Sequence, residues 1–295
     1  MNEVPTVPPK RRVLTADISI GPFASQVDVI AALGAAHRSS YVCCVNAHMT
    51  VEAREPSFAR VVNGADLATA DGMPVLKALR HFHKVAQDRV AGNDLLPALL
   101  AKAAEQGLGV FLYGGSEEVQ RRIMDRAARE FPGLRFAGGH APPYGPLEAL
   151  DLAAEAERIN ASGAHIVMVS LGCPKQERWM AAMKGRVNGV MLGLGGAFLL
   201  YAGVDTRAPK WMRDLSLEWL YRLWLEPGRL WKRYLVTNTI FLFMLVKALI
   251  RRNPSTNAYG LFLVDRRRVI SRTVYKCLKV NGSHRSHSPF LIKYE

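Results

Sequence analysis

The residues with the clearest chemical potential lie in the stretch 171–179, Leu-Gly-Cys-Pro-Lys-Gln-Glu-Arg-Trp, which follows an apolar, β-branched run typical of a buried strand. Gly172 allows a sharp exit from that strand, and Pro174 suits a first helical residue because its missing N–H is not needed there. Lys175 and Gln176 then lie at a helix N-terminus, which favours anions, at the end of a strand, where α/β proteins bind ligands. An ordinary strand-to-helix turn with a solvated lysine is the alternative interpretation.

Two further polar residues follow predicted strands. Asn46 comes after the strand 41–45, and Asp71 comes after the strand 66–70. Because the carboxyl ends of parallel strands share one edge of a sheet, we expect both residues to converge with the Lys175–Gln176 pair. A carboxylate can accept the proton of an attacking hydroxyl, so Asp71 is the best general-base candidate. Asp-Gly is also a common turn pair, and a structural role is the alternative.

Two glycine pairs, Gly114-Gly115 and Gly195-Gly196, let backbone N–H groups approach a ligand closely. The chain has no G-x-G-x-x-G fingerprint and no Walker loop, which argues against a dinucleotide enzyme and a P-loop nucleotidase. It also has no Asp-x-Asp pair, the signal of a metal-bound nucleotide-sugar site. His48, His140 and His165 lack metal-ligand spacing, so we predict no metal and no cofactor.

The elements that position these residues alternate between strands and helices up to about residue 204. This is the βαβ pattern of an α/β fold with a Rossmann-like, mostly parallel sheet and helices on both faces. The predicted strands are 41–45, 66–70, 109–113, 134–137, 165–171 and 190–194. The predicted helices are 27–36, 50–63, 73–82, 95–106, 117–131, 147–162 and 175–186. Asn93 or Asp94 is the expected N-cap of the fourth helix, and Ser116 that of the fifth.

The domain organisation follows from a change in composition. Residues 1–204 form the predicted catalytic domain, with 1–15 as a flexible arm. Residues 205–254 contain no predicted strand and are rich in Trp, Arg and Leu. This composition predicts a helical appendage at a bilayer interface. There, Trp side chains lie at the level of the head groups and Arg side chains bind lipid phosphate. Amphipathic helices packed on the sheet domain are the alternative. Residues 255–295 are a basic tail to which no role is assigned.

The overall composition indicates which kinds of partner the protein binds and in which cellular compartment it works. The 295 residues include 39 Lys and Arg against 25 Asp and Glu, a formal net charge of +14 that suits nucleic acid, phospholipid head groups or a phosphorylated substrate. The four cysteines show neither C-x-x-C nor zinc spacing, which fits a reducing compartment. We find no signal peptide and no clean run of about eighteen apolar residues, so we expect a cytoplasmic protein without a transmembrane helix.

Several motifs occur in unbroken order between residues 40 and 250. They occupy residues 45–48, 65–75, 89–95, 111–115, 171–177, 193–198, 207–211, 217–223 and 226–230. A single motif is unspecific, but the ordered set is specific, and the chain resembles the WecG/TagA/CpsF family, glycosyltransferase family 26. One departure is Cys44, which stands where the family often has Thr, so that a hydroxyl contact to the substrate is absent or replaced.

The resemblance implies an inverting, metal-independent bacterial enzyme that transfers a sugar from a UDP-sugar to an undecaprenyl-diphosphate-linked sugar. It implies Asp71 as the base, with Asn46 and Gln176 lining the pocket for the sugar and the acceptor. Arg222 and Arg229 become the catalytic candidates that meet the donor diphosphate. The other expected substrate-binding residues are Asp94, Gly114, Gly115, Gly172, Lys175, Gly195, Gly196 and Arg207.

The resemblance also implies a place in cell-surface polysaccharide or exopolysaccharide biosynthesis. The enzyme would be peripheral on the inner face of the cytoplasmic membrane, with the appendage 205–254 completing the site. The donor sugar stays open among N-acetylmannosamine, its uronic acid and glucose. The acceptor sugar, the linkage and the oligomeric state also stay open, with a homo-oligomer as one possibility.

Other classes of function explain parts of the sequence. Nucleic-acid binding would account for the positive charge and the interleaved Arg and Trp residues, but it leaves the ordered motifs unexplained, and we expect no nucleic-acid partner. A non-catalytic peripheral membrane scaffold of polysaccharide assembly predicts that Asp71→Asn leaves function intact. A different Rossmann enzyme, such as a dehydrogenase, would need the missing glycine fingerprint.

Overall fold

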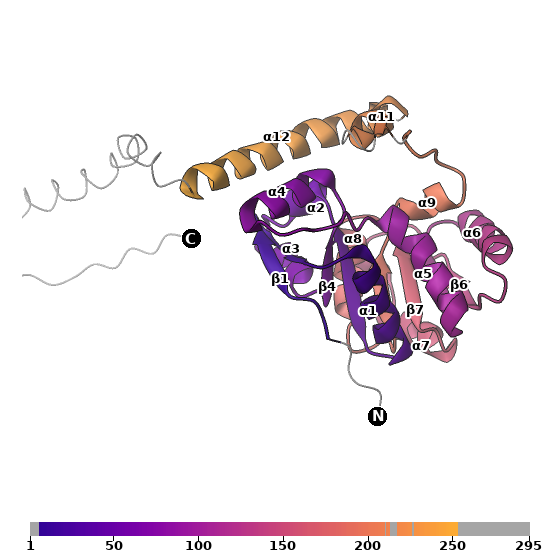
Figure 1. The fold of residues 1–295 in the computed structure, drawn as a ribbon. Helices are drawn as coiled ribbons and strands as arrows, with labels where there is room; N and C mark the ends of the chain where they lie inside the picture. The colour runs from indigo at the N-terminus through magenta and orange to yellow at the C-terminus, as the bar shows by residue number, and fades with distance from the viewer. Residues whose placement is uncertain (1–5, 210, 213–216, 226, 253–295) are drawn as a thin grey trace, which may run out of the picture. The chain divides into compact units, whose positions relative to one another are not determined.

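The computed structural model describes residues 6–209, 211–212, 217–225 and 227–252. Within this part, a parallel sheet of six strands forms the centre of the fold (Figure 1). The strands lie in the order β4 (Leu67–Ala70), β3 (Ser40–Val45), β8 (Val190–Gly193), β7 (Ile166–Ser170), β5 (Val110–Gly114) and β6 (Phe136–His140). All neighbouring pairs run parallel, which confirms the predicted Rossmann-like α/β fold.

Helices cover both faces of this sheet and divide the hydrophobic core into two clusters. One face carries α1 (Phe23–Ala35), α5 (Gly92–Gln106), α6 (Glu117–Glu130) and α9 (Ala197–Tyr201). The other carries α2 (Ala47–Glu52), α3 (Pro56–Asn63), α4 (Met73–His83), α7 (Leu152–Ala161) and α8 (Lys175–Met183). In β3, Cys43 and Val45 join one cluster while Val42 and Cys44 join the other, because successive side chains of a strand point to opposite faces.

The N-terminal segment corrects the sequence prediction. β1 (Lys10–Val13) pairs antiparallel with β2 (Ala16–Ser19), so this part of the predicted flexible arm is an ordered hairpin. Val13 and Ile18 are fully buried, and the Lys10 amine donates a hydrogen bond to the backbone carbonyl of Ala65. The strands are too short for hydrophobic periodicity to reveal, and their packing on the domain is what stabilises them.

Two predicted helices are each divided in the structure. The predicted helix 50–63 is the pair α2 and α3, because Pro56 begins a new helix at its first position. The predicted helix 147–162 consists of a short 3₁₀ turn, η1 (Leu147–Ala149), and then α7. Asp151 starts α7 by accepting hydrogen bonds from two backbone N–H groups of its first turn.

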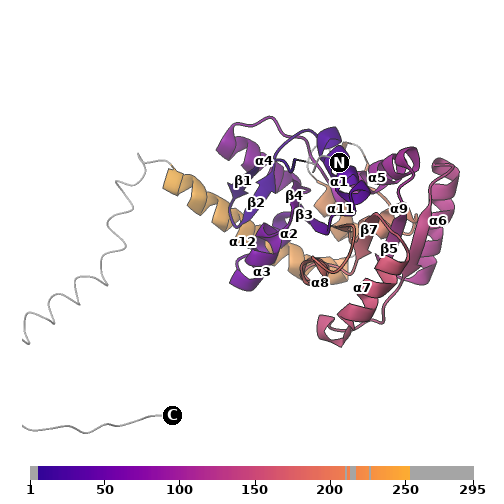
Figure 2. The same ribbon diagram turned by 90° about the horizontal axis from the view of Figure 1, so that it is seen from below.

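Two helices follow the sheet along the chain, α11 (Glu218–Leu225) and α12 (Pro227–Arg252). Residues up to Leu245 belong to one compact unit, and Val246 begins a second one. In the first unit, Thr237 and Phe241 of α12 are buried, and Phe241 is part of the core cluster that contains α2. The Thr237 hydroxyl lies 3.5 Å from Nδ1 of His48 in α2, and Figure 2 shows α12 passing alongside α2.

The same helix bears on membrane insertion. Within the described residues, the segment Tyr234–Arg251 of α12 is long and apolar enough to cross a membrane, judged by length and composition alone. The sequence prediction of no such helix relied on uninterrupted apolar runs, which Thr237, Asn238 and Thr239 break. Because these three residues carry no charge, the segment as a whole remains apolar.

Candidate active site

The carboxyl edge of the sheet gathers the predicted site residues, because all six strands end on the same side. Asp71 follows β4, Asn46 follows β3, and Lys175 begins the helix after β7. The glycines Gly114, Gly115, Gly172, Gly195 and Gly196 lie at the ends of β5, β7 and β8 or in the turns that follow. The predicted convergence therefore rests on one geometric fact, the common direction of the strands.

Asn46 and Asp71 are neighbours. Nδ2 of Asn46 lies 3.5 Å from Oδ2 of Asp71, while its Oδ1 accepts a hydrogen bond of 3.1 Å from the Met49 N–H at the start of α2. Because that oxygen is occupied, the amide N–H₂ group is the end that faces the carboxylate. A Cβ at position 72 would lie 3.2 Å from the Cβ of Asn46. Glycine at this position therefore lets Asn46 and Asp71 stay close together. Asn46 and Asp71 are both half-buried.

Cys44 lies in β3, two residues before Asn46. Its side chain is buried, and the pKa of its thiol is raised, first by burial and then by the nearby charge of Asp71. The neighbouring strand carries a hydroxyl at the aligned position, Thr69, but that hydroxyl donates to the Val90 carbonyl at 2.8 Å. The Thr69 hydroxyl is fully buried, and its proton is donated to the backbone of the stretch before α5.

Gln176 reaches from α8 across to the end of β8. A Cβ on Gly193 would lie 3.0 Å from the Gln176 Nε2, and one on Gly195 would lie 3.4 Å from its Oε1. The amide therefore lies beside the strand adjacent to β3, which leads to Asn46. Gln176 is 5% exposed, and its Oε1 has no hydrogen-bond partner among the described residues. A buried acceptor of this kind is costly unless a ligand supplies a donor.

Glu177 is a residue that sequence reasoning missed. It is fully buried, and its Oε1 accepts a 2.7 Å hydrogen bond from Nε2 of Gln176, which orients the Gln176 amide. Burial raises the pKa of Glu177, while hydrogen bonds from Gln176 and the Cys173 thiol oppose that shift. The sequence shows that Glu177 lies near the start of an amphipathic helix. It does not show which side of that helix faces the core, so the burial of Glu177 could not be predicted.

Lys175 serves a neighbouring loop in the structure. Its Nζ donates a 2.5 Å hydrogen bond to the carbonyl of Gly145, which follows β6. Pro174 is the N-cap of α8 rather than its first helical residue, which corrects the sequence prediction by one position. The lysine charge stays at the N-terminus of α8, as predicted, and its amine is anchored to backbone.

The glycine turns have a packing role in the sheet. Gly114 adopts a φ of +87°, and a Cβ there would lie 2.4 Å from the Ser170 carbonyl oxygen. The Gly115 N–H donates to that same oxygen at 2.9 Å. The Gly195 N–H likewise donates to the Val169 carbonyl at 3.2 Å. These N–H groups thus tie strand ends together, which is a structural reason for glycine at these positions.

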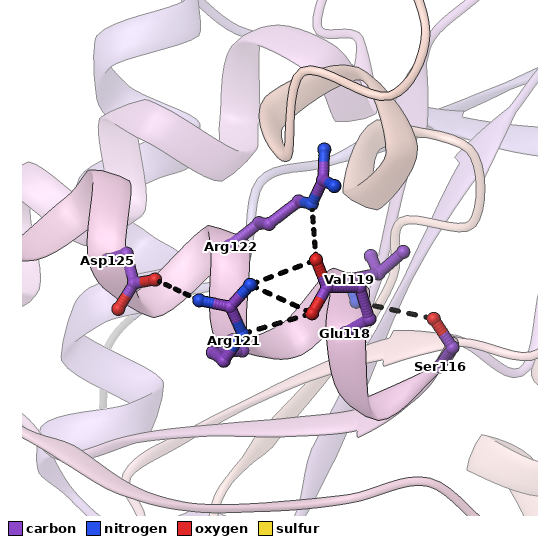
Figure 3. Close-up of polar contacts among 6 residues, drawn as sticks. All are labelled: Ser116, Glu118, Val119, Arg121, Arg122 and Asp125. Atoms are coloured by element: carbon purple, nitrogen blue, oxygen red, sulfur yellow. Dashed lines mark hydrogen bonds and ion pairs between the residues drawn. The ribbon is translucent and has the colours of Figure 1, made fainter.

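The N-terminus of α6 next to Gly115 is occupied by the chain's own groups (Figure 3). Ser116 caps the helix by accepting from the Val119 N–H at 3.3 Å, as the sequence predicts. Glu118 in the first turn bonds both Arg121 and Arg122, and Arg121 also pairs with Asp125. An acidic first turn suits the helix dipole by itself, so this helix end is a poor site for a phosphate.

Asp94 and Arg207 contact each other rather than open space. Asp94 accepts hydrogen bonds from Arg207 on Oδ1 and from Arg89, at 3.0 Å, on Oδ2. Burial would raise the pKa of Asp94, but these hydrogen bonds outweigh it and hold the pKa below its ordinary value. The predicted N-cap role of Asn93 or Asp94 is wrong, because α5 begins at Gly92 with Ala91 as a cap that makes no side-chain bond.

Two predicted catalytic residues lie outside the described side chains. The backbone of Arg222 is part of α11 and that of Arg229 is part of α12, but the structure does not describe either side chain. Among the described residues, no group of three or more His, Cys, Asp or Glu side chains is arranged to hold a metal ion.

Comparison with known proteins agrees with this architecture. The family model described as "Glycosyl transferase WecG/TagA/CpsF family" matches residues 11–255. A curated relative from Bacillus spizizenii is 33% identical over 201 residues, which cover 68% of this chain and 76% of the relative. That protein is named N-acetylglucosaminyldiphosphoundecaprenol N-acetyl-beta-D-mannosaminyltransferase. With a parallel α/β sheet, polar residues gathered at its carboxyl edge and a family match over most of its length, this chain belongs to the WecG/TagA/CpsF family of glycosyl transferases.

Proposed function

We propose that this glycosyltransferase moves N-acetylmannosamine from a UDP-linked donor to a sugar carried on undecaprenyl diphosphate, with inversion at the anomeric carbon. The relative's name supports the choice of sugar and of lipid-linked acceptor among the donors that the sequence leaves open. The observation that carries the mechanism is the contact between Asn46 and Asp71 at the carboxyl edge, one strand away from the buried Gln176 amide.

Asp71 acts as the general base in this proposal. It takes the proton of the acceptor hydroxyl while that oxygen forms a bond to C1 of the donor sugar. The bond from C1 to the diphosphate oxygen breaks on the opposite face, and UDP leaves with the electron pair. A half-buried carboxylate with an amide N–H₂ group 3.5 Å away is held in place for this task. Asn46 therefore orients Asp71 and lines the sugar pocket.

The leaving diphosphate needs positive charge without a metal. Arg222 and Arg229 supply it in this proposal, together with the N-terminus of α8 that Lys175 begins. Gln176 binds the substrate through Oε1, which is buried and bonds to no described residue. Gly172 and the turns at Gly114-Gly115 and Gly195-Gly196 complete the wall of the pocket in this proposal.

We place the enzyme at the inner face of the cytoplasmic membrane, bound peripherally. The support comes from α12, whose two sides differ. Thr237 and Phe241 are buried against the sheet domain. Exposed apolar residues on the part of α12 that belongs to the same unit include Trp231, Leu235, Val236, Leu242 and Phe243. A helix with one face on protein and another apolar face exposed fits the membrane interface better than a span surrounded by lipid. This position brings the enzyme to its lipid-linked acceptor.

A transfer assay tests the proposed function. The full chain is incubated with N-acetylglucosamine on undecaprenyl diphosphate and, separately, with UDP-linked N-acetylmannosamine, its uronic acid and glucose. Mass spectrometry of the lipid product should show the addition of one N-acetylmannosamine. Product from another donor would correct the sugar, and no product from any donor would contradict the function. Thermal shift with UDP, NAD and an oligonucleotide separates the rival classes, since only UDP compounds should stabilise the chain.

A further inference from the structure

Four charged residues from three segments, the stretch 89–94, Arg207 and the start of α11, form a continuous chain of ion pairs beside the candidate site. Arg207 bonds Asp94, Asp94 bonds Arg89, and Arg89 bonds Glu218 at 3.1 Å. The Asn93 amide adds a contact of 3.4 Å to the second oxygen of Glu218. We define this group, Arg89, Asn93, Asp94, Arg207 and Glu218, as the clasp.

The clasp is partly shielded from water. The side chains of Arg89 and Glu218 are 19% and 21% exposed, and those of Asp94 and Arg207 are each 32% exposed. Ion pairs at a fully exposed surface contribute little to stability, and partial burial makes the loss of one partner more costly. Two positive and two negative charges alternate along the chain of contacts, so each charge has an opposite neighbour.

One end of the clasp is anchored to the strand that leads to Asp71. The N–H of Val90, next to Arg89, donates to the Ala70 carbonyl at 3.0 Å, and the Val90 carbonyl accepts from the Thr69 hydroxyl. A Cβ on Gly92 would lie 3.5 Å from the Leu194 side chain, so the start of α5 rests on the end of β8. The position of the clasp is therefore tied to the carboxyl edge of the sheet.

The other end of the clasp is the first residue of α11. Glu218 begins this helix, and position 222 follows one turn later. Fixing Glu218 to Arg89 thereby fixes the start of the segment that carries a proposed catalytic arginine. We propose that Arg89, Asp94 and Glu218 are positioning residues that hold the appendage against the carboxyl edge beside Asp71. This inference rests on the proposed function, and it assigns Asp94 and Arg207 to holding the appendage rather than to binding substrate.

A double-mutant cycle between Arg89 and Glu218 tests the proposal in the full chain. Each single variant, Arg89→Gln and Glu218→Gln, should lower kcat about tenfold with little change in the KM for the UDP-sugar. The double variant should lose about tenfold rather than a hundredfold, because the two residues act through one contact. Glu105→Gln is the matched control, since Glu105 is an exposed partner of Lys102 on α5.

Limited trypsin digestion provides a readout that is independent of catalysis. Arg207, Lys210 and Arg213 are cleavage sites in the stretch before α11. Glu218→Lys, which places a positive charge beside Arg89, should speed cleavage there about tenfold and leave the melting temperature of the sheet domain within a few degrees.

Three results would overturn the proposal. Wild-type kcat and cleavage rates in the Glu218 variants would show that the contact does not position the appendage. A raised KM in Arg89→Gln with an unchanged cleavage rate would show that Arg89 binds substrate directly. A wild-type chain that transfers no sugar to any acceptor would overturn the proposed function and this inference with it, whereas an active wild type with unaffected variants overturns the inference alone.

Discussion

Asn46 and Asp71 are brought together by strand register. β3 pairs with β4 so that Val45 aligns with Ala70, and the residues that follow each strand are therefore neighbours. The N–H of Asp71 donates to the Val45 carbonyl at 3.1 Å, which continues the ladder one residue beyond the strands. At the scale of single residues, the site thus begins as an extension of the sheet.

Asp71→Asn should lower kcat by about a hundredfold to ten-thousandfold, the usual contribution of a general base. The KM for the donor and the melting temperature should change little, because the amide has the same shape. Steady-state kinetics with the lipid-linked acceptor measure this effect. Asp125→Asn, which removes an exposed ion pair with Arg121 on α6, is the control and should keep full activity. Full activity of Asp71→Asn would show that Asp71 is not the general base.

Glu177 predicts a pH dependence of stability. Because burial raises its pKa in the folded state, the folded chain binds this proton more tightly than the unfolded chain. The free energy of unfolding therefore falls as the pH rises from the unfolded pKa through the folded pKa, by about 1.4 kcal/mol per unit of pKa difference. Glu177→Gln removes this titration, so its stability relative to wild type should be higher at about pH 8 than at about pH 5.

Urea denaturation at the two pH values measures the Glu177 effect. The exposed variant Glu105→Gln should show nearly the same difference from wild type at both. An equal difference for Glu177→Gln at both pH values would mean that Glu177 keeps its ordinary pKa in the folded chain.

At the scale of elements, α12 presents two different sides within three residues. Phe241 is 5% exposed and belongs to the core cluster, whereas Phe243 is 67% exposed. Successive helical residues are separated by about 100°, so two residues apart are on nearly opposite sides. The same helix can therefore pack on the sheet domain and offer an apolar surface.

Phe241→Ala and Phe243→Ala form a matched pair on this helix. Phe241→Ala should destabilise the chain by about 3–5 kcal/mol, as for other buried phenylalanines, measured by urea denaturation. Phe243→Ala should change the stability by less than about 0.5 kcal/mol and instead weaken sedimentation with anionic lipid vesicles. Unchanged vesicle binding by Phe243→Ala would argue against the exposed side of α12 as a membrane contact.

At the scale of the whole molecule, all six strands of the parallel sheet lie before residue 204, while Arg222 and Arg229 come after it. A chain that ends at residue 204 should keep the helix and strand signals of circular dichroism. It should lose turnover by at least about a hundredfold, because the arginines for the leaving diphosphate are removed. Full activity of the shortened chain would refute the role of the appendage.

Local sequence patterns determined much of the fold. Apolar runs, glycine turns and the Ser116 cap act over a few residues, so they predicted the six parallel strands and placed Asn46, Asp71 and Gln176 after strands that end at one edge. The short N-terminal hairpin could not be predicted in this way, because two strands of four residues carry too little periodicity to be recognised.

Only the tertiary structure decided which charges meet and which side chains are buried. Asp94 and Arg207 stand 113 positions apart, and nothing in either local pattern names the other as a partner. The burial of Glu177 likewise depends on how α8 rotates against the sheet. Periodicity and capping are properties of neighbouring residues, whereas partner choice follows from packing between segments that the chain brings together only when it folds.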